Sequence, residues 1–140
     1  MAKIQLELVT AEGRILSQPA DFVRAPGLGG ELGIYPRHIP LLAPLRTGEV
    51  KVVNEGHEEL IFVAGGFLEV LPDRVVILAD DAEKAEDIDP ARAEAARRSA
   101  QDALAQNEGD ADAAAELERA LFRLRVADIR RRHQRPQRPS

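Results

Sequence analysis

The sequence from Gly29 to Leu45, GGELGIYPRHIPLLAPL, combines three glycines, three prolines and several apolar residues in one short stretch. Glycine allows backbone conformations with positive φ, whereas proline fixes φ and removes an amide donor, so the stretch predicts neither a regular helix nor a central strand. Its apolar side chains must still be covered, because large exposed apolar patches are uncommon on free monomers. We therefore predict a docking loop whose side chains meet either the core of the protein or a partner.

Short apolar segments separated by turn sequences lie on both sides of this loop. Apolar and polar residues alternate from Lys3 to Val9, which is typical of a half-buried strand. Val50–Val53 and Leu60–Val63 flank the turn sequence Asn54–His57, which predicts a β-hairpin. Strands recurring every 8 to 12 residues indicate a sandwich or barrel. Further strands are predicted at Arg14–Leu16, Phe22–Ala25, Phe67–Leu71 after a bend at Gly65–Gly66, and Val75–Leu78.

After this β-rich part the pattern changes to that of helices. Asp80–Asp87 is strongly charged and predicts a flexible linker. Asp89 is a good N-cap residue, and Pro90 suits the first position of a helix. Two mostly alanine stripes, interrupted at Gln106–Asp110, predict an antiparallel helical hairpin whose small side chains hold it only weakly. The residues of the two stripes are Ala93, Ala96, Ala100, Ala103 and Leu104, and then Leu117, Ala120, Leu121 and Leu124.

Composition limits the class of protein. A chain of 140 residues with 44% hydrophobic residues can build one modest core, and the absence of cysteine excludes disulfides and thiolate metal sites. The sequence contains neither a bilayer-spanning apolar run nor a signal-peptide pattern at its start, so we expect a soluble protein that is not exported. The formal charge is −7 over residues 1–87 and +2 over residues 88–140, which predicts different partners for the two parts.

No catalytic constellation is evident. The three histidines occur at positions 38, 57 and 133 in unrelated contexts, without carboxylates at metal-ligand spacing and without a nucleophile elbow. Gly27–Gly30 is glycine-rich but lacks the strand, lysine and helix of a phosphate-binding loop. We expect neither an enzyme in its own right nor a metal site.

Three motifs together carry a family resemblance. They are GELGIYPRHIPLL from Gly30 to Leu42, FVAGGFLEV from Phe62 to Val70, and AEDIDPARA from Ala85 to Ala93. Over about residues 3–130 the chain resembles the epsilon subunit of F-type ATP synthases. The resemblance implies β + α architecture, with an N-terminal ten-stranded β-sandwich followed by a C-terminal antiparallel two-helix hairpin. The implied division is a docking sandwich at residues 1–87, a regulatory hairpin at 88–134 and a disordered tail at 135–140.

The resemblance also implies a function. Members of the family are non-catalytic rotor subunits of the central stalk that couple the catalytic head to the c ring and inhibit ATP hydrolysis through the C-terminal helices. The implied partners are the gamma subunit, the c-subunit ring and the alpha and beta subunits of a proton-translocating enzyme. The expected location is peripheral, on the cytoplasmic side of the bacterial inner membrane, with no required cofactor and no nucleic acid.

Partner-binding residues follow from the same resemblance. Glu31, Tyr35, His38 and Leu42 are expected to meet gamma and the c ring, although Tyr35 and Arg37 replace a smaller apolar residue and glycine. The alternative for His38 is a surface histidine without a special role. The basic end of the chain is expected to face acidic segments of the beta subunit, the alternatives being a solvated tail or, with little aromatic support, an RNA-binding arm. The residues assigned to this contact are Arg123, Arg125, Arg130 and Arg131, with Arg132 and Arg135 nearby.

A nucleotide site is the second implication, and an ATP-binding sensor module is the alternative function. Some bacterial members bind ATP as a regulatory ligand through the motif Ile-Asp-x-x-Arg-Ala when the helices are folded down. Arg119 and Arg123 lie four residues apart on one helix face, which suits phosphate oxygens. Ser99 departs from the pattern, since nucleotide-binding members commonly carry arginine there. The alternative is that Asp89 merely caps the helix and Arg92 pairs with an acidic neighbour. The matching residues are Glu83, Ile88, Asp89, Arg92, Ala93, Arg119 and Arg123.

Overall fold

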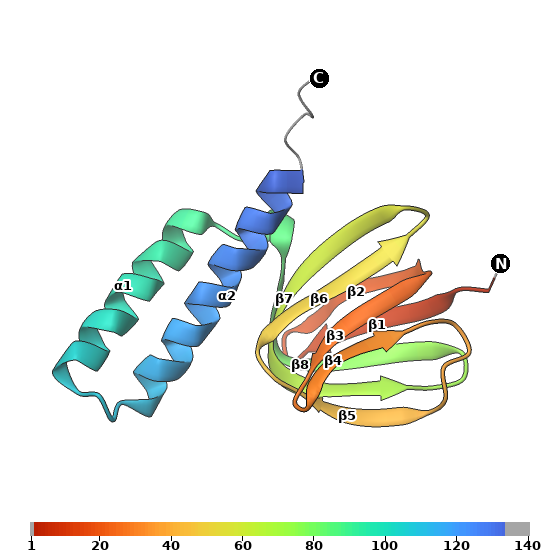
Figure 1. Cartoon of the computed structure of the whole chain (residues 1–140), viewed down its shortest axis with the longest axis horizontal. Coiled ribbons are helices and arrows are strands. Elements are labelled where there is room, and N and C mark those ends of the chain that lie inside the picture. Colours follow the sequence, from red (N-terminus) through yellow and green to blue (C-terminus); the bar gives the residue numbers. More distant parts are fainter. Residues whose placement is uncertain (1, 134–140) are drawn as a thin grey trace, which may run out of the picture. The chain divides into compact units, whose positions relative to one another are not determined.

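The structure is a computed structural model that describes residues 2–133. The chain divides into two compact units, Met1–Lys84 and Ala85–Ser140, and the tail predicted at 135–140 lies outside the described residues (Figure 1). The first unit contains β1 (Ile4–Thr10), β2 (Gly13–Ala20), β3 (Phe22–Gly27), β4 (Gly30–Ile34), β5 (Leu41–Leu45), β6 (Gly48–Asn54), β7 (His57–Val70) and β8 (Arg74–Lys84). The second contains the short 3-10 helix η1 (Ala85–Asp87), α1 (Pro90–Gln106) and α2 (Ala111–His133).

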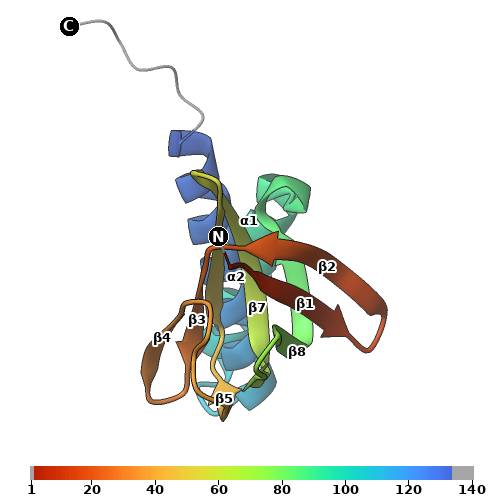
Figure 2. The same cartoon turned by 90° about the vertical axis from the view of Figure 1, so that its right-hand side faces the viewer.

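Two long strands connect the layers of the sandwich. The first half of β7 pairs with β6 and its second half pairs with β5, while β8 accompanies both halves. One layer therefore runs β4-β3-β6-β7-β8, and the other runs β5-β7-β8-β1-β2, with β1 and β8 parallel. Figure 2 shows the β1–β2 and β3–β4 hairpins on opposite sides of the sandwich.

The change of layer occurs at Gly65–Gly66. Gly66 has a φ of +110°, a conformation that L side chains rarely adopt. A Cβ on this residue would overlap the carbonyl oxygen of Leu78 and lie 2.8 Å from the Cα of Ala79 on β8. The bend thus depends on glycine for two independent reasons, its backbone conformation and the closeness of the neighbouring strand.

Three sequence expectations about the β-rich part are wrong. The expected ten strands are eight in the described residues, because β7 continues as one strand through the predicted bend at Gly65–Gly66 and β8 continues into the predicted linker. The linker expected at Asp80–Asp87 is instead the end of β8 followed by η1, and Lys84 still pairs with Ile61. The predicted loop at Gly29–Leu45 contains β4 and β5, so only residues 35–40 connect strands irregularly.

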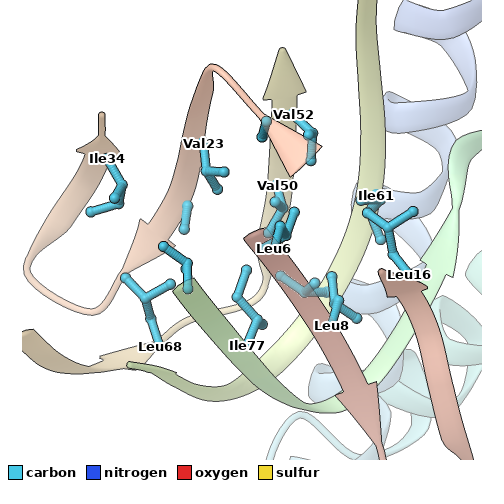
Figure 3. Packing of buried hydrophobic residues seen from close by; sticks show 14 of the residues in the cluster. Leu6, Leu8, Leu16, Val23, Ile34, Val50, Val52, Ile61, Leu68 and Ile77 are labelled. Atoms are coloured by element: carbon cyan, nitrogen blue, oxygen red, sulfur yellow. The ribbon is translucent and has the colours of Figure 1, made fainter. Parts of the chain in front are cut away.

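The core of the first unit lies between the two layers and is aliphatic, as the low aromatic content of the sequence indicates. Ile4, Leu6 and Leu8 are buried on one face of β1, which confirms the predicted alternation. They meet buried residues of β6, β7 and β8, including Val50, Val52, Ile61 and Ile77 (Figure 3). Complete burial of one such side chain contributes about 1.5–3 kcal/mol, so these residues are the main apolar contribution to the stability of the sandwich.

The second unit is an antiparallel pair of helices (Figure 1). Asp89 caps α1 and Pro90 is its first residue, as predicted. At the start of α2, Asp110 Oδ1 accepts a hydrogen bond from the amide of Ala113 at 3.0 Å. Leu121 was expected in the buried stripe but is 48% exposed, whereas Ala113 and Val126 are buried without having been predicted. Three members of the predicted stripes are buried as expected, namely Ala93, Ala100 and Ala120.

Candidate functional site

An exposed apolar face lies on the outside of the layer that contains β5, β7 and β8. Phe67 pairs with Pro44 on one side and with Leu78 on the other, so their side chains share this face. Phe67 is 54% exposed, Leu78 is 52% exposed, and Leu42, two residues from Pro44, is 68% exposed. We call Leu42, Pro44, Phe67 and Leu78 the apolar face.

Of these residues only Leu42 was predicted to bind a partner. Phe67 and Leu78 were missed because both lie in strongly apolar strands, where every large side chain looks like core. Their neighbours Leu68 and Ile77 are fully buried, and strict alternation along a strand then turns Phe67 and Leu78 outward. A period-2 count along each strand was the signal that would have found them.

The connection between β4 and β5 forms one end of the sandwich. Tyr35 is 64% exposed and its ring lies 4.6 Å from that of Phe22, at an interplanar angle of 38°. His38 Nδ1 lies 2.7 Å from the carbonyl oxygen of Ile39, and Ile39 is itself 74% exposed. Tyr35 and His38 line the same small cavity of about 20 Å³, so two of the four predicted docking residues come together here.

Glu31 is held by basic residues of neighbouring segments. Its carboxylate accepts a hydrogen bond from Arg46 Nη2 at 2.7 Å and lies 3.9 Å from Arg24 Nε. Arg24 also pairs with the buried Glu49 at 3.4 Å. These links join β3, β4, the β5–β6 connection and β6, so the predicted docking residue Glu31 is fixed in place by its own sandwich.

The candidate nucleotide residues belong to both units of the chain, with Glu83 in the first and the other six in the second. Asp89 uses its carboxylate to accept hydrogen bonds from the amides of Ala91 at 3.0 Å and Arg92 at 3.5 Å. The Arg92 side chain is exposed and pairs with no acidic group in residues 2–133, so of the alternative without a ligand only the cap at Asp89 is found. Arg119 lies 3.5 Å from Glu116.

The remaining candidates occupy different surroundings. Ile88 and Ala93 are buried, Arg123 is half-buried on α2, and Glu83 lies on β8 in the other unit. A cavity of about 290 Å³ lies beside α1 and η1, and of the seven candidates only Ile88 lines it within the described chain. Its other lining residues include Glu86, Pro90, Leu124, Arg130 and Arg131.

The C-terminal half of α2 is basic. Residues 117–133 contain six arginines and two carboxylates, which gives a formal charge of +4. Asp128 pairs with Arg131 and with Arg132, each at 3.0 Å. Arg123 and Arg130 are half-buried, and Arg125 is exposed. The positive charge stands at the helix C-terminus, where the helix dipole favours cations.

The described residues contain no cluster of His, Cys, Asp and Glu suited to a metal ion. None of the described helices has the length and apolar character needed to span a bilayer.

Comparison with known proteins assigns the family. The model described as "ATP synthase, Delta/Epsilon chain, beta-sandwich domain" matches residues 3–85, and the one described as "ATP synthase, Delta/Epsilon chain, long alpha-helix domain" matches residues 86–128. The ATP synthase epsilon chain of Dehalococcoides mccartyi (strain CBDB1) is 48% identical over 137 residues, covering 95% of this chain and 98% of that protein. The chain belongs to the ATP synthase epsilon chain family. It is a non-catalytic subunit of ATP synthase.

A further epsilon chain and a solved structure agree with this assignment, and a second solved structure shares the fold. The epsilon chain of Herpetosiphon aurantiacus is 50% identical over 134 residues, covering 94% of this chain and 98% of that protein. A chain in the Euglena gracilis mitochondrial ATP synthase structure (OSCP/F1/c-ring, rotational state 1) matches with a TM-score of 0.74 and 26% identity, covering 92% of this chain and 82% of that one. A chain of the Tetrahymena thermophila mitochondrial enzyme has the same fold, with a TM-score of 0.52 at 17% identity over 61% of this chain and 69% of that one.

Proposed function

We propose that this epsilon chain is a central-stalk rotor subunit of a proton-translocating F-type ATP synthase, peripheral to the bacterial inner membrane on its cytoplasmic side. In this role the sandwich docks on the gamma subunit and the c ring, and the helices meet the alpha and beta subunits. Family membership supports the proposal, and so does the similarity to a chain of the Euglena complex that contains F1 and a c ring.

The observation that carries the docking role is the apolar face. Leu42, Phe67 and Leu78 are more than half exposed on three neighbouring strands, while the core is complete without them. Exposed aromatic and leucine side chains grouped in this way cost free energy in water and are typical of protein interfaces. The gamma subunit is the partner proposed for this face, and the c ring is the partner proposed for the Tyr35–His38 end.

The experiment for the docking role measures the affinity of the full chain for a purified rotor made of gamma and the c ring. Replacing Phe67 and Leu78 by serine removes two central apolar contacts, and we expect the dissociation constant to rise by about a hundredfold, roughly 2.7 kcal/mol. The matched control is Leu121→Ser, because Leu121 is similarly exposed but lies on α2. Its affinity for the rotor should stay unchanged. Unchanged rotor affinity of the Phe67→Ser, Leu78→Ser variant would refute this docking face.

Inhibition of ATP hydrolysis through the helices is the regulatory part of the proposal. The fully buried residues of α1 and α2 are alanines with the addition of Val126, so little apolar area holds the two helices together. An element held this weakly separates at low free-energy cost. The +4 charge of residues 117–133 then gives the released helix an electrostatic attraction to acidic segments of the beta subunit through Arg123, Arg125, Arg130 and Arg131.

ATP as a regulatory ligand is the second candidate function. It is favoured by the exposed side chain of Arg92, which has no acidic partner in residues 2–133 and remains available to a phosphate. The test is calorimetric titration of the full chain with ATP. We expect saturable binding that Arg92→Ala weakens and that the control Arg98→Ala leaves unchanged, whereas no heat at millimolar ATP would exclude the sensor role.

A further inference from the structure

Arg37 has an unfavourable backbone conformation, and its guanidinium group has no ion-pair partner among residues 2–133. Its φ of +67° lies in the left-handed region, where a residue with a side chain costs on the order of 1 kcal/mol relative to glycine. The side chain is exposed and makes no ion pair or hydrogen bond with any residue from 2 to 133. Contacts inside the described chain therefore do not account for an arginine at this position.

Arg74 is a second arginine without an ion-pair partner in the described residues, and it lies at the same cavity as Arg37. It is the first residue of β8, its side chain is exposed, and it also has no side-chain partner among residues 2–133. Arg37 and Arg74 line the same 20 Å³ cavity, together with Tyr35, His38 and Asp73. The β4–β5 connection, which carries Arg37, and the start of β8, which carries Arg74, lie at the same end of the sandwich (Figure 2).

The remaining lysine at this cavity is already paired. Lys3 lines the cavity, but its ammonium group pairs with Asp21 at 3.0 Å and with Glu55 at 3.6 Å. Among the described residues that line the cavity, Arg37 and Arg74 are therefore the two guanidinium groups without an ion-pair partner.

We propose that Arg37 and Arg74 form a carboxylate-binding clamp that receives one acidic side chain from a loop of the protein on which this end docks. A guanidinium group matches a carboxylate through two parallel hydrogen bonds, and two such groups hold it from both sides. The proposal rests on the proposed docking function and specifies the chemistry of the partner.

Charge and the neighbouring apolar side chains favour a carboxylate over a phosphate. The cavity of 20 Å³ holds about one water-sized group, so it receives a single oxygen of the anion. Asp73 at the cavity offsets one of the two guanidinium charges, which suits a ligand with a single negative charge. The exposed Tyr35 and Ile39 beside the clamp require apolar cover, which a protein loop supplies and a free anion does not.

The test compares the affinity of full-length variants for the rotor of gamma and the c ring at low and high salt. We expect Arg37→Gly and Arg74→Gln each to bind about tenfold more weakly, with a smaller loss of affinity on adding salt than the unmodified chain shows. The control Arg14→Gln removes a cation in the β1–β2 hairpin and should bind normally. Arg37→Gly should also unfold at an equal or higher temperature, because glycine relieves the backbone cost, so its weaker binding would not be a folding defect.

Three results would overturn the clamp. If the unmodified chain and both variants bind the rotor equally well, the clamp is wrong while the docking function stands. If the unmodified chain does not bind the rotor, both the docking function and the clamp fail. If the variants lose binding only to vesicles of phosphatidylglycerol and phosphatidylcholine, the ligand is a lipid phosphate instead of a protein carboxylate.

Discussion

Replacing Gly66 by alanine tests whether the bend in β7 holds the sandwich together. The backbone conformation at φ +110° costs an L-residue about 1–3 kcal/mol. The added Cβ would overlap the carbonyl oxygen of Leu78 and lie 2.8 Å from Ala79 Cα and 2.9 Å from the carbonyl carbon of Leu78. These are backbone atoms of β8, so the two strands must separate and weaken their ladder at this point. We expect a total loss of at least about 3 kcal/mol in the free energy of unfolding.

The assay is thermal unfolding of the full chain followed by circular dichroism. For a unit of this size each kcal/mol shifts the melting temperature by about 4–8 °C, so Gly66→Ala should lower it by at least about 12 °C. Gly29→Ala is the matched control, since a Cβ there meets nothing within 4 Å and the φ is not positive, and its melting temperature should stay within about 2 °C of the unmodified chain. Equal melting temperatures for the two variants would refute the role given to the bend.

Two further predictions concern Asp21, which lies between β2 and β3, and the helices. Asp21 accepts a hydrogen bond from the amide of Glu55 at 2.8 Å and pairs with Lys3, and these two contacts hold the pKa of its carboxyl below the usual value. Because the folded-state pKa is lowered, the stabilisation is present above the unfolded value near 3.8 and disappears as pH falls through the folded value. Asp21→Asn should therefore melt below the unmodified chain at neutral pH and match it in strong acid, and a difference independent of pH would contradict this. Removing residues 88–140 should leave assembly on the rotor intact and raise ATP hydrolysis by the reconstituted enzyme, and an unchanged hydrolysis rate would exclude inhibition by the helices.

Local signals in the sequence predicted several elements correctly. The alternation in β1, the turn between β6 and β7 and the cap of α1 at Asp89 each depend on residues close together in the chain. The alanine contact between the helices follows from spacing along each helix. Such features are visible in the sequence because their physical causes act within a few residues.

The errors arose where distant segments decide the outcome. Gly65–Gly66 can end a strand or bend it, and only the ladder of β7 with β8 keeps the strand continuous. The acidic residues after Asp80 suggested a linker, yet β8 continues there because β7 pairs with it as far as Lys84. Arg46 holds Glu31 from fifteen residues away, and neither local pattern nor composition indicates that pair.

The central claim is that the outer face of β5, β7 and β8 contacts the gamma subunit, and site-directed cross-linking tests it most directly. The natural sequence contains no cysteine, so Phe67→Cys introduces a single reactive thiol on the apolar face. In the complete ATP synthase we expect a short thiol-to-amine cross-linker to join this residue to gamma. The control Glu58→Cys, an exposed position on β7 in the other layer, should not be joined to gamma. Failure of Phe67→Cys to cross-link to gamma, or equal cross-linking of both positions, would contradict the proposed docking face.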